Sequence, residues 1–324
     1  MKVTRSAPVV DQAFRHSLAV YSSRADLVAQ LVEVAASARG RGEPVALALH
    51  PATTEDLVEH LGSDTGLQAL ATPYGPDAGS GQTVAVARAR ELRELTDAVG
   101  PVTVLAEHLG QLDGPDGGYW TELDAATNIA LGPLPIAMTC FFPELPLHQE
   151  VLDGARRNHP QLLVDGAARP NGAHRTPREV LSGHRVPAPV LLGAPERRIT
   201  FRAFELQQVR QAVRTTALDA GFERSRAEDV VLAVNEVATN AVEHGGPGSG
   251  SDKKEAQLCL WAGSGGLVCE VHDGGVLVDP LPGLQPPHPS DPRGRGLWIA
   301  RQICDLLHVW TDTSGTHVRL RASP

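Results

Sequence analysis

The chain has few aromatic residues and few cysteines. Only 4% of its 324 residues are Phe, Trp or Tyr, so its cores are expected to consist of Val, Leu and Ala. The 32 glycines and 25 prolines predict many loops. The four cysteines show neither a C-x-x-C pair nor metal-ligand spacing, which argues against a disulfide framework and a cysteine-based metal motif. We expect them to be buried thiols in a reducing cytoplasm.

Positive charge and long apolar runs are also scarce. The chain has 38 acidic and 29 basic residues and a net charge of −9, which disfavours direct contact with nucleic acid or an anionic membrane. It has no run of 18 apolar residues, and its amino terminus, MKVTRSAPVV, lacks the apolar core of a signal peptide. We therefore expect a cytoplasmic protein without a membrane span. Its length allows two domains.

Three regions differ in pattern. Residues 1–165 alternate short apolar runs, such as PVALALH and PIAMTCFF, with helical periodicity, which predicts a parallel α/β sheet. Residues 166–198 are rich in proline, glycine and arginine, which indicates an ordered or semi-rigid linker. Residues 199–324 contain two predicted helices, a pair of strands, a further helix and a final strand. This order predicts an α+β two-layer sandwich.

The segment SRAEDVVLAVNEVATNAVEHGG, residues 225–246, is predicted to be a helix with one polar flank. Ser225 and Glu228 fit a capping box at its start. The stripe expected to face the core comprises Val230, Val234, Val237 and Ala241. The polar flank comprises Glu236, Asn240 and Glu243, with His244 near its edge. Such a flank is commonly only solvated, but three motifs further along the chain favour a cleft.

The first of these motifs is a D-x-G at the end of a predicted strand, Asp273 and Gly275. It places a carboxylate where a purine amino group could donate, and its glycine permits close approach. The second is the glycine-rich start of a helix, where free backbone amides suit phosphate. It comprises Gly294, Arg295, Gly296 and the following Leu297. The third motif, Gly315 and Thr316, begins the last strand. Each motif alone is a weak turn signal.

In this order the four motifs resemble the GHKL (Bergerat) superfamily of ATP-binding domains, and most closely its anti-sigma-factor serine/threonine kinase branch. The resemblance covers residues 201–321, and its most specific parts are LAVNEVATNAVEHG and RGRGLWIARQICD. One departure is Leu277, which stands where the family pattern D-x-G-x-G has its second glycine. The resemblance implies that this region binds Mg-ATP.

The resemblance also implies a role for individual residues. Glu236 would be the general base, and Asn240 would hold Mg²⁺ against the triphosphate. Asp273, with Gly275 beside it, would accept a hydrogen bond from the adenine amino group, and Thr316 would back the adenine. The other nucleotide contacts that it implies are His244, Gly294, Arg295, Gly296 and Leu297.

The amino-terminal region resembles the MEDS domain, a sensory module related to the RecA-like nucleotide-binding folds. His16 before LAVY, the segment LAEHLG and the segment CFFPELPLHQEVLDGARRNHPQLL carry this likeness. No G-x-x-x-x-G-K-[ST] motif occurs there, so we expect no ATP hydrolysis in this region. The spacing of its histidines fits neither a metal site nor a phosphorelay, which favours scattered structural histidines. They are His16, His108, His148 and His159; a ligand contact by His16 stays open.

The combination resembles the anti-sigma regulatory proteins of actinobacteria. It implies an anti-sigma factor that binds Mg-ATP, sequesters a sigma factor and phosphorylates Ser or Thr on an anti-anti-sigma (STAS-type) partner, in signal transduction that controls transcription. A homodimer is compatible with it. A non-catalytic interaction module that uses ATP only as a conformational latch stays open. Transfer of the γ-phosphate to a partner would discriminate the two.

Overall fold

The computed structural model describes most of the chain. The described residues are 14–62, 66–70, 80–110, 117–145, 149–182, 186, 188–246, 254–263, 265–277, 279, 281–287 and 295–324. The chain forms two compact units. The first comprises Met1–Thr72, Arg88–Asp113 and Ala130–Arg175, and the second comprises Pro73–Ala87, Gly114–Ile129 and Thr176–Pro324.

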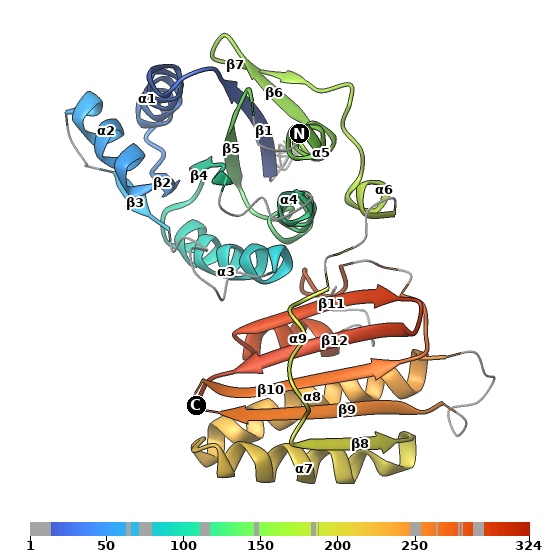
Figure 1. The fold of residues 1–324 in the computed structure, drawn as a ribbon. Helices are drawn as coiled ribbons and strands as arrows, with labels where there is room; N and C mark the ends of the chain where they lie inside the picture. Colours follow the sequence, from blue (N-terminus) through green and yellow to red (C-terminus); the bar gives the residue numbers. More distant parts are fainter. Residues whose placement is uncertain are drawn as a thin grey trace, which may run out of the picture. The chain divides into compact units, whose positions relative to one another are not determined.

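The first unit is built on a seven-stranded sheet with the order β3-β2-β4-β5-β1-β6-β7 (Figure 1). Its strands are β1 (Phe14–Tyr21), β2 (Val45–Ala48), β3 (Leu67–Ala69), β4 (Val102–Glu107), β5 (Ile136–Pro143), β6 (Gln161–Val164) and β7 (Ala167–Pro170). Every pairing is parallel except the antiparallel hairpin β6–β7. The parallel sheet predicted from the sequence is thus confirmed.

Helices separate the strands as the alternating pattern predicts. They are α1 (Arg24–Gly40), α2 (Pro51–Leu61), α3 (Gly81–Val99), α4 (Gly118–Ala130) and α5 (Gln149–Asn158). The Ser23 side chain accepts a hydrogen bond from the Asp26 backbone at the start of α1. Leu27, Leu31 and Ala35 follow at a spacing of four residues and are buried. They pack in one cluster with Leu47 and Phe141 of the sheet.

The region 166–198 contains regular structure in addition to irregular chain. Strand β7 lies within it and extends the first unit to Arg175. The short helix α6 (Pro177–Ser182) follows. Strand β8 (Arg197–Phe201) begins at the end of this region and pairs with the second sheet.

The second unit contains a five-stranded antiparallel sheet with the order β11-β12-β10-β9-β8. Its further elements are a 3-10 turn, η2 (Ala203–Glu205), α7 (Leu206–Asp219), α8 (Arg224–His244), β9 (Ala256–Gly263), β10 (Gly266–Asp273), α9 (Arg295–Ile303), β11 (Leu306–Asp312) and β12 (Gly315–Ala322). The helices α7 and α8 lie along one side of the sheet (Figure 1). Val230, Val234 and Val237 of α8 share a core with Leu258 and Val271. This is the predicted two-layer sandwich.

The start of α8 differs from the prediction. Its N-cap is Glu223, which makes no side-chain capping bond, so Ser225 lies inside the first turn. Glu228 instead accepts hydrogen bonds from Nε and Nη2 of Arg214, at 2.7 and 2.9 Å. The predicted capping box is therefore wrong. A paired, charge-assisted contact with α7 engages the carboxylate that the box would have used.

Residues from the amino-terminal half belong to the second unit and cover its edge strand β11. The Gln82 side chain donates to the Val309 carbonyl at 2.9 Å and accepts from the Val309 N–H at 3.3 Å. Thr83 donates to the Leu307 carbonyl at 3.4 Å. Unpaired backbone groups of an edge strand invite pairing with another chain. These side chains satisfy the Val309 N–H and the carbonyls of Val309 and Leu307 within the unit.

All four cysteines are buried thiols that form no disulfide, as predicted. Among the helices described, none is long and apolar enough to cross a membrane.

Candidate functional site: a nucleotide-sized cavity

A cavity of about 360 Å³ lies among α8, the end of β10, the chain that follows it, α9 and β12. Six of the predicted contact residues line it: Asn240, His244, Asp273, Gly275, Leu297 and Thr316. Its apolar lining includes Val237, Ala241, Val271, Leu277, Val309 and Val318. An apolar cavity of this size with a few convergent polar groups is typical of a small-molecule site. The fold thus gathers motifs that are distant in the sequence.

Helix α8 supplies one polar side of the cavity. Because Val237 and Ala241 are buried against the sheet, Asn240 is held at the margin of the core, where it is half-buried. His244, one turn later, is exposed and lies at the end of the helix. Asn240 therefore lines a partly dehydrated part of the cavity, while His244 lines a part that is exposed to solvent.

The end of β10 supplies the acidic group. The Asp273 Oδ1 atom accepts a hydrogen bond from the Gly275 backbone at 2.7 Å, which fixes the carboxylate and leaves Oδ2 as an acceptor. Burial raises the pKa of Asp273 above its ordinary value, and the Gly275 N–H opposes this shift. A fixed, half-buried acceptor of this kind suits an amino group such as that of a purine.

Glycines permit the close approach of α8 and β10 at this point. A Cβ atom on Gly245 would stand 2.5 Å from Asp273 Oδ1, and one on Gly275 would stand 2.9 Å from the Gly245 Cα. Any larger residue at either position would push these segments apart. Gly245 and Gly275 are thus explained by packing around the cavity.

Thr316 connects the last strand to the same corner. It pairs with Asp273 in the β10–β12 register, and its hydroxyl donates to the Gly275 carbonyl at 2.9 Å. This hydrogen bond fixes the chain that follows β10, and the lone pairs of the Thr316 hydroxyl oxygen can still accept a hydrogen bond. Thr316 has a positioning role in addition to lining the cavity.

Glu236 and Gly296 meet next to the cavity. A Cβ atom on Gly296 would stand 2.5 Å from Glu236 Oε2, so the start of α9 lies against this half-buried carboxylate. Arg295 is the exposed first residue of α9, and Gly294 lies outside the described residues. The first turn of a helix carries backbone N–H groups without intrahelical partners and a partial positive charge. It suits an anion such as a phosphate.

Several lining residues were not predicted from the sequence. Pro282 and Gly283 line the cavity, and a Cβ atom on Gly283 would stand 2.8 Å from Leu297. Arg301, buried in α9, donates to the Pro282 carbonyl at 3.0 Å. The Pro-Gly pair is a recognisable turn signal. However, its position against α9 depends on contacts that are distant in the sequence.

Comparison with known families agrees with this geometry. Residues 199–322 match a histidine kinase-like ATPase domain. The match confirms the GHKL resemblance for this part of the chain and implies ATP binding there. A sequence comparison with curated proteins finds no match.

The residues of the ATPase domain fit a nucleotide. The cavity offers a fixed carboxylate acceptor at Asp273, a half-buried amide at Asn240 and an apolar wall for a purine ring. Gly275 and Gly296 lie where a side chain would collide with Asp273 or Glu236. Leu277, in place of the second glycine of the family pattern, is half-buried and joins the apolar lining. The departure therefore leaves the cavity open.

Proposed function

We propose that the chain is an anti-sigma factor whose ATPase domain binds Mg-ATP and phosphorylates Ser or Thr on an anti-anti-sigma (STAS-type) partner. The observation that carries this proposal is the convergence of Asn240, Asp273 and Thr316 on one cavity, next to the contact between Glu236 and Gly296. When bound, Mg-ATP supplies the phosphoryl group and a divalent charge that neutralises the phosphates.

Each residue has a defined task in this proposal. Asp273 Oδ2 accepts the hydrogen bond of the adenine amine, and Asn240 offers its amide oxygen to the ion. The backbone N–H groups at Gly296 donate to phosphate oxygens. Glu236 accepts the proton of the partner's Ser or Thr hydroxyl, and the oxygen of that hydroxyl forms a bond to the γ-phosphorus. At the same time the bond between the γ-phosphorus and the ADP oxygen breaks. Positioning and charge neutralisation are the main contributions that this reaction needs.

The regulatory role rests on resemblance. The segments LAVNEVATNAVEHG and RGRGLWIARQICD resemble the anti-sigma kinase branch, and the ATPase-domain match supports the superfamily to which that branch belongs. We further propose that the amino-terminal region is a RecA-like, MEDS-type sensory domain of a cytoplasmic protein. Its parallel sheet is compatible with this proposal.

A second candidate function is a non-catalytic latch, in which ATP only stabilises one conformation. The position of Glu236 favours it, because a carboxylate at the start of α9 stabilises that helix end without any chemistry. In this case Glu236 is structural. The sigma-factor or antagonist interaction would then depend on ATP occupancy alone.

Calorimetry of the full chain tests the nucleotide site. With Mg²⁺ present, Asn240→Ala is expected to weaken ATP binding by about 2–5 kcal/mol, since the ion is the largest charge in such a site. The matched control is Asn235→Ala on the same helix, whose side chain accepts from Arg210 at 2.9 Å. Equal heats for wild type and Asn240→Ala would contradict the assignment.

Affinity capture tests the regulatory role. The full chain, loaded with ATP, with ADP or without nucleotide, is used to capture partners, which are identified by mass spectrometry. We expect a sigma factor or a STAS-type protein whose retention changes with the nucleotide. If neither protein is captured in any nucleotide state, the anti-sigma proposal is contradicted, whereas the assignment of the ATP site is not affected.

A further inference from the structure

Two histidines and a cysteine meet on one face of the sheet in the first unit. His16 lies on β1 and Cys140 on the neighbouring strand β5, while His159 directly follows α5. In the parallel register His16 is opposite Met138. Cys140, two residues further along, therefore faces the same side as His16. All three side chains are buried.

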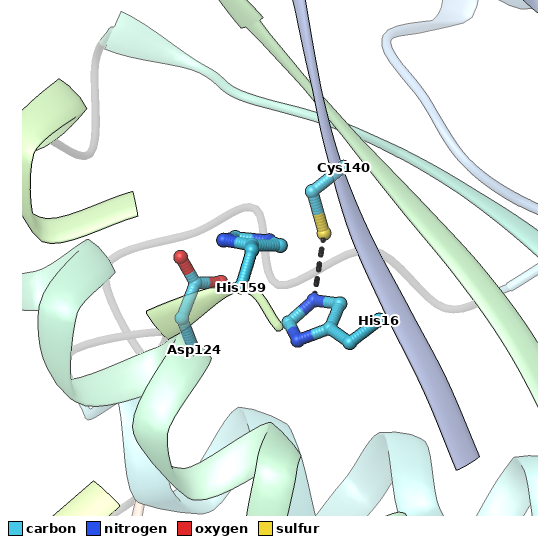
Figure 2. Close-up of side chains that lie close together, drawn as sticks. All are labelled: His16, Asp124, Cys140 and His159. Carbon is cyan, nitrogen blue, oxygen red and sulfur yellow. Dashed lines mark hydrogen bonds between the residues drawn. The ribbon is translucent and has the colours of Figure 1, made fainter. Parts of the chain in front are cut away.

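The donor atoms of these residues are close together. His16 Nε2 lies 3.2 Å from Cys140 Sγ, and the rings of His16 and His159 have centroids 4.0 Å apart. Figure 2 shows these three side chains close together, and one ligand atom from each of them lies within 4.8 Å of the others. All three residues belong to the first unit.

The orientation of His159 is fixed by the backbone. Its Nδ1 atom lies 2.7 Å from the Ala155 carbonyl oxygen. Since a carbonyl only accepts, Nδ1 carries the proton and Nε2 is the nitrogen without a proton, which is the form of the ring that binds a metal. A ring nitrogen donating to a backbone carbonyl while the other nitrogen binds metal is the usual arrangement around a metal-bound histidine.

We propose that His16, Cys140 and His159 bind a zinc ion. Zinc–sulfur and zinc–nitrogen bonds of about 2.3 and 2.0–2.1 Å place the sulfur and nitrogen of a tetrahedral site about 3.5 Å apart. The observed 3.2 Å between His16 Nε2 and Cys140 Sγ is close to this separation. Thiolate and imidazole are the ligands that zinc prefers, and an oxygen ligand completes the site. On binding, the Cys140 thiol loses its proton and becomes a thiolate.

No motif with a fixed residue spacing indicates this site in the sequence. His16 and Cys140 are 124 residues apart, and His159 follows on a different element. The sequence therefore predicted scattered structural histidines. His16 and His159 differ from this prediction, because they are not scattered in the structure: the fold brings their rings into contact. His108 lies instead beside Phe142, with ring centroids 5.0 Å apart, and His148 lies outside the described residues.

Metal analysis of the full chain tests the proposal independently of ATP. Protein expressed with added zinc is expected to retain about one zinc per chain. Metal-free protein titrated with Co²⁺ is expected to develop a thiolate-to-cobalt charge-transfer band. Cys140→Ser should abolish that band and lower Co²⁺ affinity at least about tenfold. The matched control, Cys259→Ser, alters a buried cysteine of the second unit and should behave like wild type.

A wild-type chain that binds cobalt without the thiolate band would overturn the proposal. So would a Cys140→Ser variant with an unchanged band. If Cys140→Ser does not fold, the melting temperature of the metal-free wild type decides. We expect it to rise on addition of zinc, because binding to the folded state alone is stabilising. An unchanged melting temperature would mean that the three residues form only a packed core contact.

Discussion

The side chain of Glu236 lies where two roles are possible, and one substitution separates them. Glu236→Gln keeps the shape and one acceptor oxygen but cannot accept a proton at neutral pH. We expect phosphoryl transfer to a partner to fall about 10²–10⁴-fold, with ATP affinity nearly unchanged. The measurement is transfer of labelled γ-phosphate, with Glu243→Gln, exposed on the same helix, as the control. A mutant that transfers phosphate at the parent rate would favour the latch.

Asp273 predicts a pH dependence of nucleotide binding. Burial raises the pKa of this carboxyl group, so it becomes protonated at a higher pH than an ordinary aspartate. The protonated form loses acceptor capacity toward the adenine amine. ATP affinity should therefore be full above the raised pKa and decline as the pH falls through it. Titration calorimetry at several pH values checks this, and Asp273→Asn should be weaker and flatter across the series.

The helix α9 is held by a buried arginine. Arg301 donates to the Pro282 carbonyl at 3.0 Å, to the Leu307 carbonyl at 3.0 Å and to Gln82 Oε1 at 2.8 Å. Burial lowers the pKa of Arg301 to about 10, which still leaves it charged at neutral pH. The side chain thus connects α9 to the cavity lining through Pro282 and to the strand that follows.

Arg301→Met should therefore affect both stability and binding. It leaves three acceptors without these donors, and we expect a loss of about 3–5 kcal/mol in the free energy of unfolding. ATP affinity should fall as well, because Pro282 lines the cavity. Urea unfolding and calorimetry measure the two effects. Arg214→Met, which removes an exposed pair with Glu228, should change neither by much. Unchanged ATP affinity in Arg301→Met would show that Pro282 does not position the site.

Helix α4 carries a second buried ionisable group, Glu122, in the same network. The Oε1 atom of Glu122 lies 3.7 Å from His308 Nδ1. Burial raises the pKa of Glu122 to about 7, although hydrogen bonds from Gln82 and Gly81 and the charge of Arg301 lower it. A raised pKa in the folded state favours the protonated acid. The stability that protonated Glu122 contributes is therefore fully present below about pH 4.5, the pKa of this group in the unfolded chain. It is lost as the pH rises through about 7, the pKa in the folded chain. The loss should be about 3 kcal/mol.

Denaturant unfolding at several pH values tests this sign. Glu122→Gln keeps the shape without the charge, so its free energy of unfolding should vary less between about pH 5 and pH 8 and exceed the wild-type value at the upper end. A control substitution at exposed Glu223 should keep the wild-type slope. Parallel pH profiles for Glu122→Gln and wild type would contradict the assignment.

The second unit as a whole includes more than its ATPase domain. The ATPase domain begins at Ile199, but Gln82 and Glu122 belong to the same compact unit as β11 and α9. A fragment of residues 199–324 would expose the Val309 backbone and leave Arg301 without Gln82. We expect it to melt at a lower temperature than the full chain and to self-associate through β11. A fragment that stays monomeric and melts with the full chain would contradict this.

The sequence by itself determined the local elements of the ATPase domain. The bounds of β9 and β12 and the buried stripe of α8 follow from alternation and helical periodicity, which are properties of neighbouring residues. The same holds for the order of the nucleotide motifs. Gly245 and Gly275 had to be glycine for a reason of space, and the sequence showed these glycines without the reason.

Only the tertiary structure decided the contacts between distant segments. Gln82 contacts Val309, 227 residues further along the chain, and His16 contacts Cys140, 124 residues further along. Neither contact produces a periodic pattern or a fixed short spacing in the sequence. The cap of α8 was mispredicted because Arg214 of another helix competes for Glu228. Local periodicity encodes which face of an element is buried. Which element it is buried against depends on the closure of long loops and on packing, and these are properties of the folded chain.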